Sequence, residues 1–212
     1  MKKAIYILIF SLFVTQAVQA QDFPSQIWHK GKISLTTGEA YSGKVKYDLE
    51  TNIVQLQTES IETFSATSVD HFEIFDEFYG GIRTFYSLPY AVNSDYETPI
   101  FFELLVQGED VTLLCREYIT TDSRGMYRSM YNPMYMNPMY GIPRMNSSKL
   151  AFEYYFLTAS EIQKYRQKKK ELLEVMDDKS DEVKLYMRKN RLSHDKRGDL
   201  LRITAYYNQL KE

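Results

Sequence analysis

The chain has 212 residues, a formal net charge of −2 at pH 7, 15% aromatic residues and one cysteine. A single cysteine excludes an intramolecular disulfide, so the fold must depend on a hydrophobic core. The length allows one good-sized domain or two small ones.

The first twenty residues have the pattern of a secretory signal peptide. Met1 to Lys3 form a short positive region, residues 4–14 an uncharged apolar run, and Val18 to Ala20 a small-residue site before Gln21. The apolar run is shorter than the ~20 residues that span a bilayer. We therefore expect a mature chain from Gln21 to Glu212 that is exported to the periplasm or secreted. It should have no transmembrane segment, and the absence of a cysteine at the cleavage site argues against a lipid anchor.

Residues 21–157 are expected to form an antiparallel β domain. Hydrophobic and polar residues alternate in short runs between turn residues. The expected strands cover residues 26–35, 41–47, 52–57, 69–75, 82–88, 100–107, 111–120 and 150–157. Their spacing predicts a barrel-like domain or a sandwich, and the first four could form a small SH3-like barrel or a curved meander.

An unusual insert interrupts this domain at residues 121–149. Within it, residues 126–145 hold six of the nine Met, four Tyr and three of the six Pro, and Asn-Pro-Met-Tyr occurs twice. Proline disfavours a ladder strand or a long helix here. A loop of this length is usually functional or disordered.

Three interpretations of the insert stay open at the sequence level. Met134, Met136 and Met139, with Met126 and Met130 upstream, offer thioether ligands that suit Cu(I). Met and Tyr together can also form an adaptable apolar contact surface for a partner. The third interpretation is a loop without a role.

Residues 158–212 change to a helical period. Thr158 and Glu161 fit a capping box, which predicts a helix from there to about Met176. Ser180 is expected to cap a second helix that ends near Asn190. A third helix should begin near residue 195. The predicted fold class is α+β, an antiparallel β domain followed by a C-terminal segment of about three helices.

Charge is distributed unevenly between the two parts. Residues 21–157 contain 10 Lys and Arg against 18 Asp and Glu, whereas residues 158–212 contain 14 against 10. Such asymmetry indicates an anionic partner, mutual attraction of the two parts, or ordinary solvated faces. The basic run Lys164 to Lys170 could contact phosphate groups, although a solvated helix face is the simpler interpretation, and export argues against nucleic acid.

Catalytic and metal-binding motifs are not found. His29, His71 and His194 lie far apart, without zinc-site spacing, and there is no GxSxG, Walker or GxGxxG motif. The pairs Asp76-Glu77 and Asp177-Asp178 have the character of turn or cap residues, and Cys115 that of a buried hydrophobe. We therefore name no catalytic, cofactor-binding or metal-ligating residue, and we expect no cofactor and no enzymatic activity.

Aromatic residues are the remaining candidates for ligand contacts. In a β domain many of them must be core residues and cross-strand partners. Those that could also line a ligand groove are Tyr86, Tyr90, Tyr96, Tyr154 and Tyr155.

The whole arrangement resembles a loose group of exported bacterial proteins of unknown function. The resemblance rests on the signal peptide, the segments Trp28–Leu35 and Gly43–Tyr47, the Phe101–Gly108 hairpin and the closing Tyr206-Tyr207-Asn208. It implies export and a β-then-α order. From the residues we expect a non-enzymatic binding or structural protein of the bacterial envelope, with an envelope protein as a candidate partner. The alternatives are a copper-handling protein that uses the insert and a hydrolase whose site is scattered in sequence.

Overall fold

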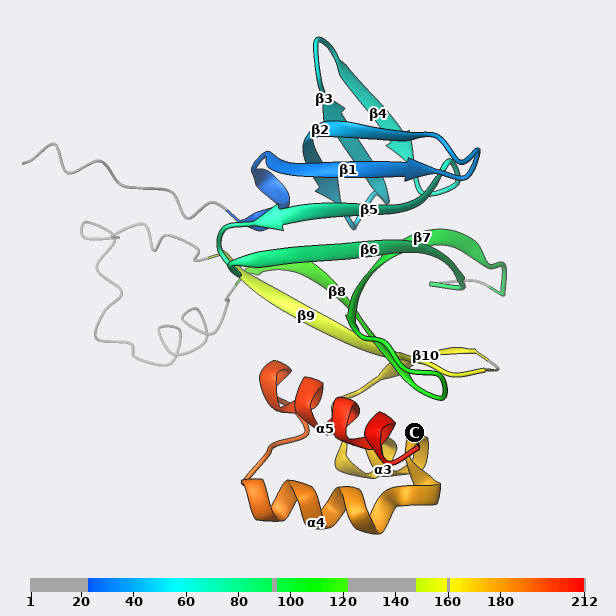
Figure 1. Ribbon diagram of the computed structural model, residues 1–212, viewed down its shortest axis with the longest axis vertical. Coiled ribbons are helices and arrows are strands. Elements are labelled where there is room, and N and C mark those ends of the chain that lie inside the picture. The colour runs from blue at the N-terminus through cyan, green and yellow to red at the C-terminus, as the bar shows by residue number, and fades with distance from the viewer. Residues whose placement is uncertain (1–22, 93–94, 122–147, 160, 212) are drawn as a thin grey trace, which may run out of the picture.

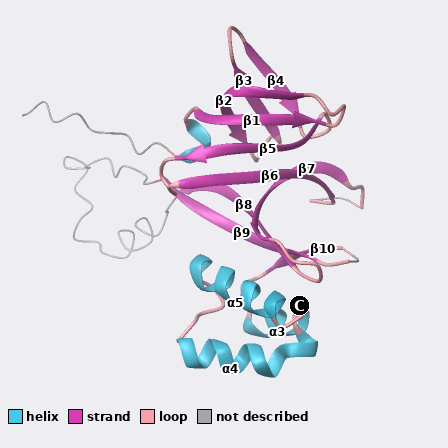
Figure 2. Ribbon diagram, in the orientation of Figure 1, coloured by secondary structure: helices cyan, strands magenta, loops and turns pink. Residues whose placement is uncertain are grey.

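The computed structural model describes residues 23–92, 95–121, 148–159 and 161–211. Within these residues ten strands form one antiparallel sheet, and three α-helices follow it in the sequence (Figures 1 and 2). The predicted α+β class is therefore confirmed, and the sheet is open rather than closed into a barrel. None of the helices in the described part of the chain is long and apolar enough to cross a bilayer.

The strands are β1 (His29–Leu35), β2 (Ala40–Asp48), β3 (Ile53–Gln57), β4 (Ile61–Ser65), β5 (Val69–Asp76), β6 (Gly81–Tyr90), β7 (Thr98–Val106), β8 (Thr112–Thr121), β9 (Ser148–Leu157) and β10 (Ile162–Tyr165). Their order in the sheet is β10-β9-β8-β7-β6-β5-β1-β2-β3-β4. A short 3-10 turn, η1 (Pro24–Gln26), precedes β1. The chain therefore makes a four-stranded meander, returns to pair β5 with β1, and continues as a second meander.

The first half of the sheet curls around its own core. Only residues 66–68 connect the edge strand β4 to β5, which lies on the far side of β1. Phe72 and Phe85 stack at 4.6 Å between ring centroids, and Phe101 meets Phe72 edge-on at 5.1 Å. The buried residues of this core are Ile33, Val45, Tyr47, Leu49, Val54, Leu56, Ala66, Val69, Phe72, Ile74, Phe85 and Phe101. The four strands expected to form a barrel or curved meander are β1, β2, β3 and β5, and they lie together in the order β5-β1-β2-β3, whereas the meander itself is completed by β4.

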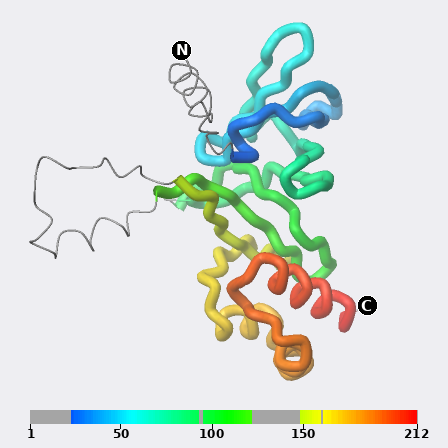
Figure 3. The backbone as a smooth tube through the Cα atoms, turned by 90° about the vertical axis from the view of Figure 1, so that its left-hand side faces the viewer, coloured from blue at the N-terminus to red at the C-terminus, as the bar shows by residue number. Residues whose placement is uncertain are grey.

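The second half carries the helices on one face. These are α3 (Lys169–Val175), α4 (Ser180–Asn190) and α5 (Arg197–Gln209), with the 3-10 turn η4 (Asp177–Lys179) between the first two. Figures 1 and 3 show the curled half, the flatter half and the helices following one another along the molecule. The core between sheet and helices contains Val111, Leu113, Cys115, Tyr154, Phe156, Tyr165, Leu172, Met176, Val183, Met187, Leu192, Leu200, Ile203 and Tyr207. A smaller cluster contains Ile100 and Phe102 on β7, with Leu114 on β8 and Tyr155 on β9, which alternate with the core residues of β8 and β9.

Two of the three expected helices are confirmed nearly as predicted. Helix α4 begins at Ser180 and ends at Asn190, and Val183 and Met187 are buried. The N-cap residue of α4 is Lys179 and Ser180 is the first residue of the helix, so the predicted capping role of Ser180 is wrong. The helix ends because Arg191 adopts a left-handed conformation, in which its backbone N–H donates to the carbonyls of Met187 and Arg188.

The helix predicted from Thr158 to Met176 is wrong over its first half. Residues 162–165 form strand β10, which pairs with residues 154–157 of β9, and the helix begins only at Lys169. The Thr158 N–H donates to the Glu161 carbonyl at 3.0 Å, so the capping-box residues close a hairpin turn instead. Pairing with β9 buries Tyr165 against Phe156, a tertiary gain that overrides local helix propensity.

Opposite charges join the two parts of the chain. The guanidinium of Arg197 on α5 lies 2.9 Å from Glu103 on β7, and Lys211 lies 3.4 Å from Asp110 in the β7–β8 connection. Of the interpretations of the charge asymmetry, these ion pairs favour mutual attraction. The short edge strand β4 was not predicted, and the Met/Tyr/Pro-rich residues 122–147 lie outside the described residues.

Candidate functional site

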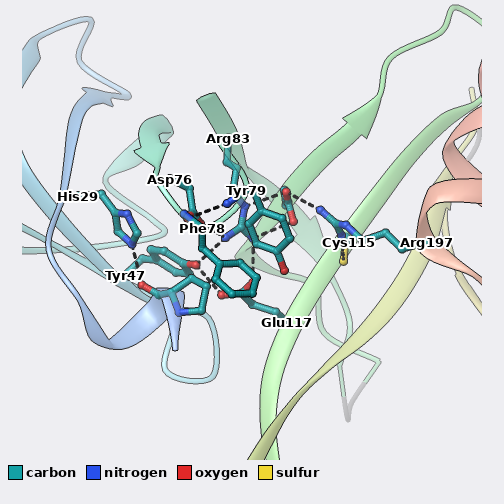
Figure 4. Close-up of polar contacts among 11 residues, drawn as sticks. His29, Tyr47, Asp76, Phe78, Tyr79, Arg83, Cys115, Glu117 and Arg197 are labelled. Atoms are coloured by element: carbon teal, nitrogen blue, oxygen red, sulfur yellow. Dashed lines mark hydrogen bonds and ion pairs between the residues drawn. The ribbon is translucent and has the colours of Figure 1, made fainter. Parts of the chain in front are cut away.

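A buried ionic cluster lies where the curled half of the sheet meets the flatter half (Figure 4). We call it the Arg83 cluster. Its members come from five strands and one helix: Tyr47 on β2, Asp76 on β5, Arg83 on β6, Glu103 on β7, Glu117 on β8 and Arg197 on α5. All except Arg197 are at most 5% exposed.

The guanidinium of Arg83 uses all five of its N–H donors. Nε and Nη2 donate to the two oxygens of Glu103, both at 2.9 Å. Nη1 donates to Asp76 and to the Tyr47 hydroxyl, both at 2.9 Å, and Nη2 also donates to Glu117 at 2.8 Å. This is the full donor capacity of an arginine, so the buried charge is completely hydrogen-bonded.

The acceptors are just as fully engaged. Glu117 accepts from the Tyr47 hydroxyl at 2.5 Å through its second oxygen. Asp76 accepts the backbone N–H of Phe78 at 2.9 Å through its other oxygen, which fixes the β5–β6 turn. Glu103 receives a second cation, because Arg197 Nη2 donates to it at 2.9 Å. Two cations therefore face three carboxylates.

Aromatic rings cover the two guanidinium groups. The ring of Tyr79, from the β5–β6 turn, lies 4.9 Å from the Arg83 guanidinium carbon and 5.5 Å from that of Arg197. Phe152 on β9 lies 5.1 Å from Arg197. Gly80, with a φ of +67°, provides the left-handed residue that the turn requires. The turn thereby closes the cluster from solvent, while Phe78 beside it remains 74% exposed.

In this environment Arg83, Tyr47 and Cys115 all stay protonated near neutral pH. Burial opposes the charge of Arg83, but the hydrogen bonds and charge of Glu103 outweigh it and raise its pKa above the ordinary value. Burial is also the main cause that raises the pKa of the Tyr47 hydroxyl and of the Cys115 thiol above their usual ranges. The thiol accepts from Arg197 Nη1 at 3.3 Å. The cluster can thus hold strands and charges in place, and neither Tyr47 nor Cys115 is prepared for proton transfer.

The sheet splits beside the cluster. Pairing between β7 and β8 ends at Glu103 and Cys115, and beyond this point the two strands separate. Residues 98–102 of β7 pair with β6, whereas residues 116–121 of β8 pair with β9. The separation is visible in Figure 1, where β7 curves away from β8.

The β2–β3 turn fills the start of this split. The side-chain oxygen of Asn52 accepts the N–H of Phe101 at 3.2 Å and Arg116 Nη1 at 3.0 Å. Arg116 also donates to the carbonyls of Phe101, at 2.6 Å, and Leu49. Asn52 has a φ of +55°, which Asn adopts more readily than most residues. These contacts fasten the turn of the curled half to the diverging strands.

Beyond this contact lies a groove of about 490 Å³, which we call the β8 groove. One wall is β8, and the other consists of η1 and the facing ends of β2 and β3. Its lining residues are Ser25, Gln26, Lys46, Tyr47, Asp48, Leu49, Glu50, Ile53, Gln55, Glu117, Tyr118 and Ile119. Tyr47 and Glu117 belong to both the groove and the Arg83 cluster, so the cluster holds the two walls in a fixed relation.

The histidines that the sequence offered are not brought together. His29 Nε2 contacts the Pro24 carbonyl at 2.7 Å, His71 contacts Asp70 at 2.7 Å, and the ring of His194 lies beside Tyr165. In the described part of the chain, no group of three or more His, Cys, Asp or Glu side chains is arranged to hold a metal ion. The Met residues that could bind copper lie outside the described residues.

The five candidate tyrosines are not brought to one place, although Tyr90 and Tyr155 meet edge-on at 5.4 Å between ring centroids. Tyr154 lies in the core under the helices, while Tyr90 and Tyr155 meet Phe102 edge-on in the smaller cluster. Tyr86 faces His71, and Tyr96 is exposed. They do not form one ligand groove, and none of them lines the β8 groove.

The basic run is also divided. Lys164 lies on β10 and pairs with Glu153 at 2.6 Å, whereas Lys169 and Lys170 open α3. The helix face predicted for this run is therefore wrong.

Sequence reasoning missed the Arg83 cluster, although a signal was present. Arg83 lies two residues before Phe85 and therefore on the same face of its strand. Glu103 interrupts the apolar run of β7, and Glu117 likewise lies two residues after Cys115. A charge at an inward position of a strand must be paired, because burying it alone is costly. Asp76 is a turn residue, as expected, but it is also a buried ion-pair partner.

Comparison with protein-family models, curated proteins and solved structures finds no match for this chain.

Proposed function

We propose that this chain is an exported, non-enzymatic binding protein of the bacterial envelope, and that its ligand occupies the β8 groove. The observation that carries the proposal is the way the groove is built. Tyr47 on one wall donates to Glu117 on the other at 2.5 Å, and both are held by Arg83. A site whose walls are fixed before binding loses less entropy when the ligand arrives.

The composition of the groove suits a ligand with both polar and apolar groups. Ile53 and Ile119 offer apolar surface, and the side chains of Lys46 and Glu50 offer charge. Grooves of a few hundred cubic ångströms with mixed linings are common ligand sites in proteins. Export is supported by the leader pattern of residues 1–20.

The buried acid groups of the Arg83 cluster, of which Glu117 also lines the groove, support binding rather than catalysis. A general acid or base must exchange a proton with its substrate. Glu117 and Asp76 instead accept hydrogen bonds through both oxygens from groups of the fold itself. Copper handling by the Met-rich insert stays a separate prediction, because the insert lies outside the described residues.

An affinity capture from envelope extracts tests the proposal. Immobilised protein should retain a component that Glu50→Lys, a charge reversal at the groove wall, no longer retains. The matched control is Glu59→Lys, which makes the same change at an exposed turn outside the groove. Equal retention by both variants would place the ligand elsewhere and refute the role of the groove.

Export is tested on the same expressing cells. Fractionation and N-terminal sequencing should find the chain outside the cytoplasm and beginning at Gln21. An intact leader on cytosolic protein would refute export.

A further inference from the structure

We infer that the β8 groove receives an extended polypeptide segment of a partner protein, which adds a strand to the open edge of β8. The inference rests on the proposed function and deepens it by naming the class of ligand.

The edge of β8 is open because β7 leaves it. Among the described residues, β9 alone pairs with residues 116–121 of β8, and the ladder to β7 ends at Cys115. Each residue of a strand directs its backbone N–H and C=O groups toward one neighbour or the other. Alternate residues of this stretch therefore direct these groups away from β9, toward the side where β7 has turned off.

The open stretch begins just after Arg116. The side chain of Arg116 and the Asn52 amide occupy the first position of the split, where they bond Phe101 on the departing strand. Residues 117–121 continue past this contact. Five residues of strand extend over roughly 17 Å, a length that pairs with a short extended segment.

The groove provides what a bare sheet edge lacks. Other strand edges occur in the described residues, for example at β4, but β4 has an exposed, largely polar surface. The edge of β8 instead faces walls formed by residues 46–50, Ile53 and Gln55. An added strand would place alternate side chains against these walls, and main-chain pairing with side-chain pockets is the general basis of strand addition.

Charge in the groove indicates the character of the segment. Asp48 and Glu50 are acidic, Lys46 is basic, and Glu117 is already paired with Arg83. The Asp48 carboxylate accepts the N–H groups of Glu50 and Thr51, so its charge is fixed in place. The remaining balance of charge favours a segment with at least one basic residue, and β-branched residues are the types that favour the extended conformation of a strand.

The test uses a nine-residue peptide in which Val and Thr alternate between terminal lysines. A second peptide of the same sequence carries a methyl group on every internal backbone nitrogen, which removes the donors needed for strand pairing. Binding to the full exported chain is measured by fluorescence anisotropy, and amide hydrogen exchange is measured on the same complexes. We expect the unmodified peptide to bind at least tenfold more tightly than the methylated one and to slow exchange within residues 117–121.

Charge variants test the location. Glu50→Lys should weaken binding of the basic peptide severalfold, whereas Glu59→Lys should leave it unchanged. Equal binding of the two peptides, or protection only at β4, would overturn the inference. If Glu50→Lys still abolished capture of the envelope component in that case, the proposed function would stand with a ligand of another class.

The chain's own insert is the competing occupant. A variant in which residues 122–147 are replaced by a short Gly-Ser linker should bind the peptide with the affinity of the full chain. Tenfold tighter binding by this variant would show that the insert competes for the β8 edge, and would overturn the assignment to a partner protein.

Discussion

Removing the positive charge at the centre of the Arg83 cluster should destabilise the protein strongly. In Arg83→Met the apolar stem is kept, but five hydrogen bonds are lost. Glu103 would keep Arg197 as a partner, whereas Asp76 and Glu117 would be buried without a cation. Breaking a buried ion pair on one side costs about 3–5 kcal/mol, because the remaining charge is uncompensated.

This loss is large relative to the total stability of a domain. Proteins of this size unfold with a free energy of about 5–15 kcal/mol. With a urea m-value of about 2 kcal/mol/M, a loss of 4 kcal/mol would lower the unfolding midpoint by about 2 M. The assay is urea unfolding followed by circular dichroism, with the slope compared between variants.

Two further variants make the measurement specific. Arg188→Met makes the same substitution at an exposed position of α4 and should change the free energy of unfolding by less than about 0.5 kcal/mol. Adding Glu117→Gln to Arg83→Met removes one orphaned charge, so the double variant should be less destabilised than the sum of the single variants by about 1 kcal/mol or more. A midpoint for Arg83→Met within 0.5 M of the wild type would refute the reasoning.

Three other predictions follow from individual residues. Because burial raises the pKa of the Cys115 thiol and shields it, iodoacetamide should label Cys115 only in denaturant, as read by mass spectrometry; rapid labelling of native protein would contradict this. In Gly31→Ala a Cβ would lie 2.3 Å from the Glu73 carbonyl oxygen, so the free energy of unfolding should fall by about 1–3 kcal/mol in the same urea assay. The control Gly81→Ala places its Cβ in open space and should leave the free energy of unfolding nearly unchanged. Burial and the hydrogen bond to Asp178 raise the pKa of Tyr207 to about 12, above the ordinary value of 10.0. Its contribution to stability is therefore complete below pH 10 and is lost as the pH rises toward 12. Tyr207→Phe should therefore lose less stability than the wild type between pH 10 and 12, and equal losses would refute the assignment.

The fold class could be predicted because local patterns and tertiary structure agree over most of the chain. Alternation placed eight of the ten strands in the described residues, and the apolar spacing placed α4 and α5. Strand β4 was not predicted because its residues are mostly exposed, so its sequence lacks an alternation of buried apolar and exposed polar residues. Strand β10 was not predicted because Thr158 and Glu161 have the spacing of a capping box, which indicates a helix. Only the pairing of β10 with β9 shows that these two residues close a hairpin turn.

The candidate site was beyond local reasoning for a different physical reason. Tyr47 and Glu117 are 70 positions apart in the sequence, and Glu103 and Arg197 are 94 positions apart. No periodicity reports which distant side chains meet. Inward charges on strands do report that a partner must exist, so Arg83 could have been identified as a buried ion before its partners were known.

The Arg83 cluster also explains how one sheet can hold two different shapes. The curled half and the half under the helices meet at β6, and an apolar junction there would tolerate several registers of similar energy. A slip of one residue would turn Arg83 to the opposite face, where Glu103 and Glu117 do not lie. The bidentate contact with Glu103 therefore penalises every register but one. The same residues set the position of β8 relative to the β2–β3 turn, so the register that buries Arg83 correctly is also the one that keeps the β8 groove open.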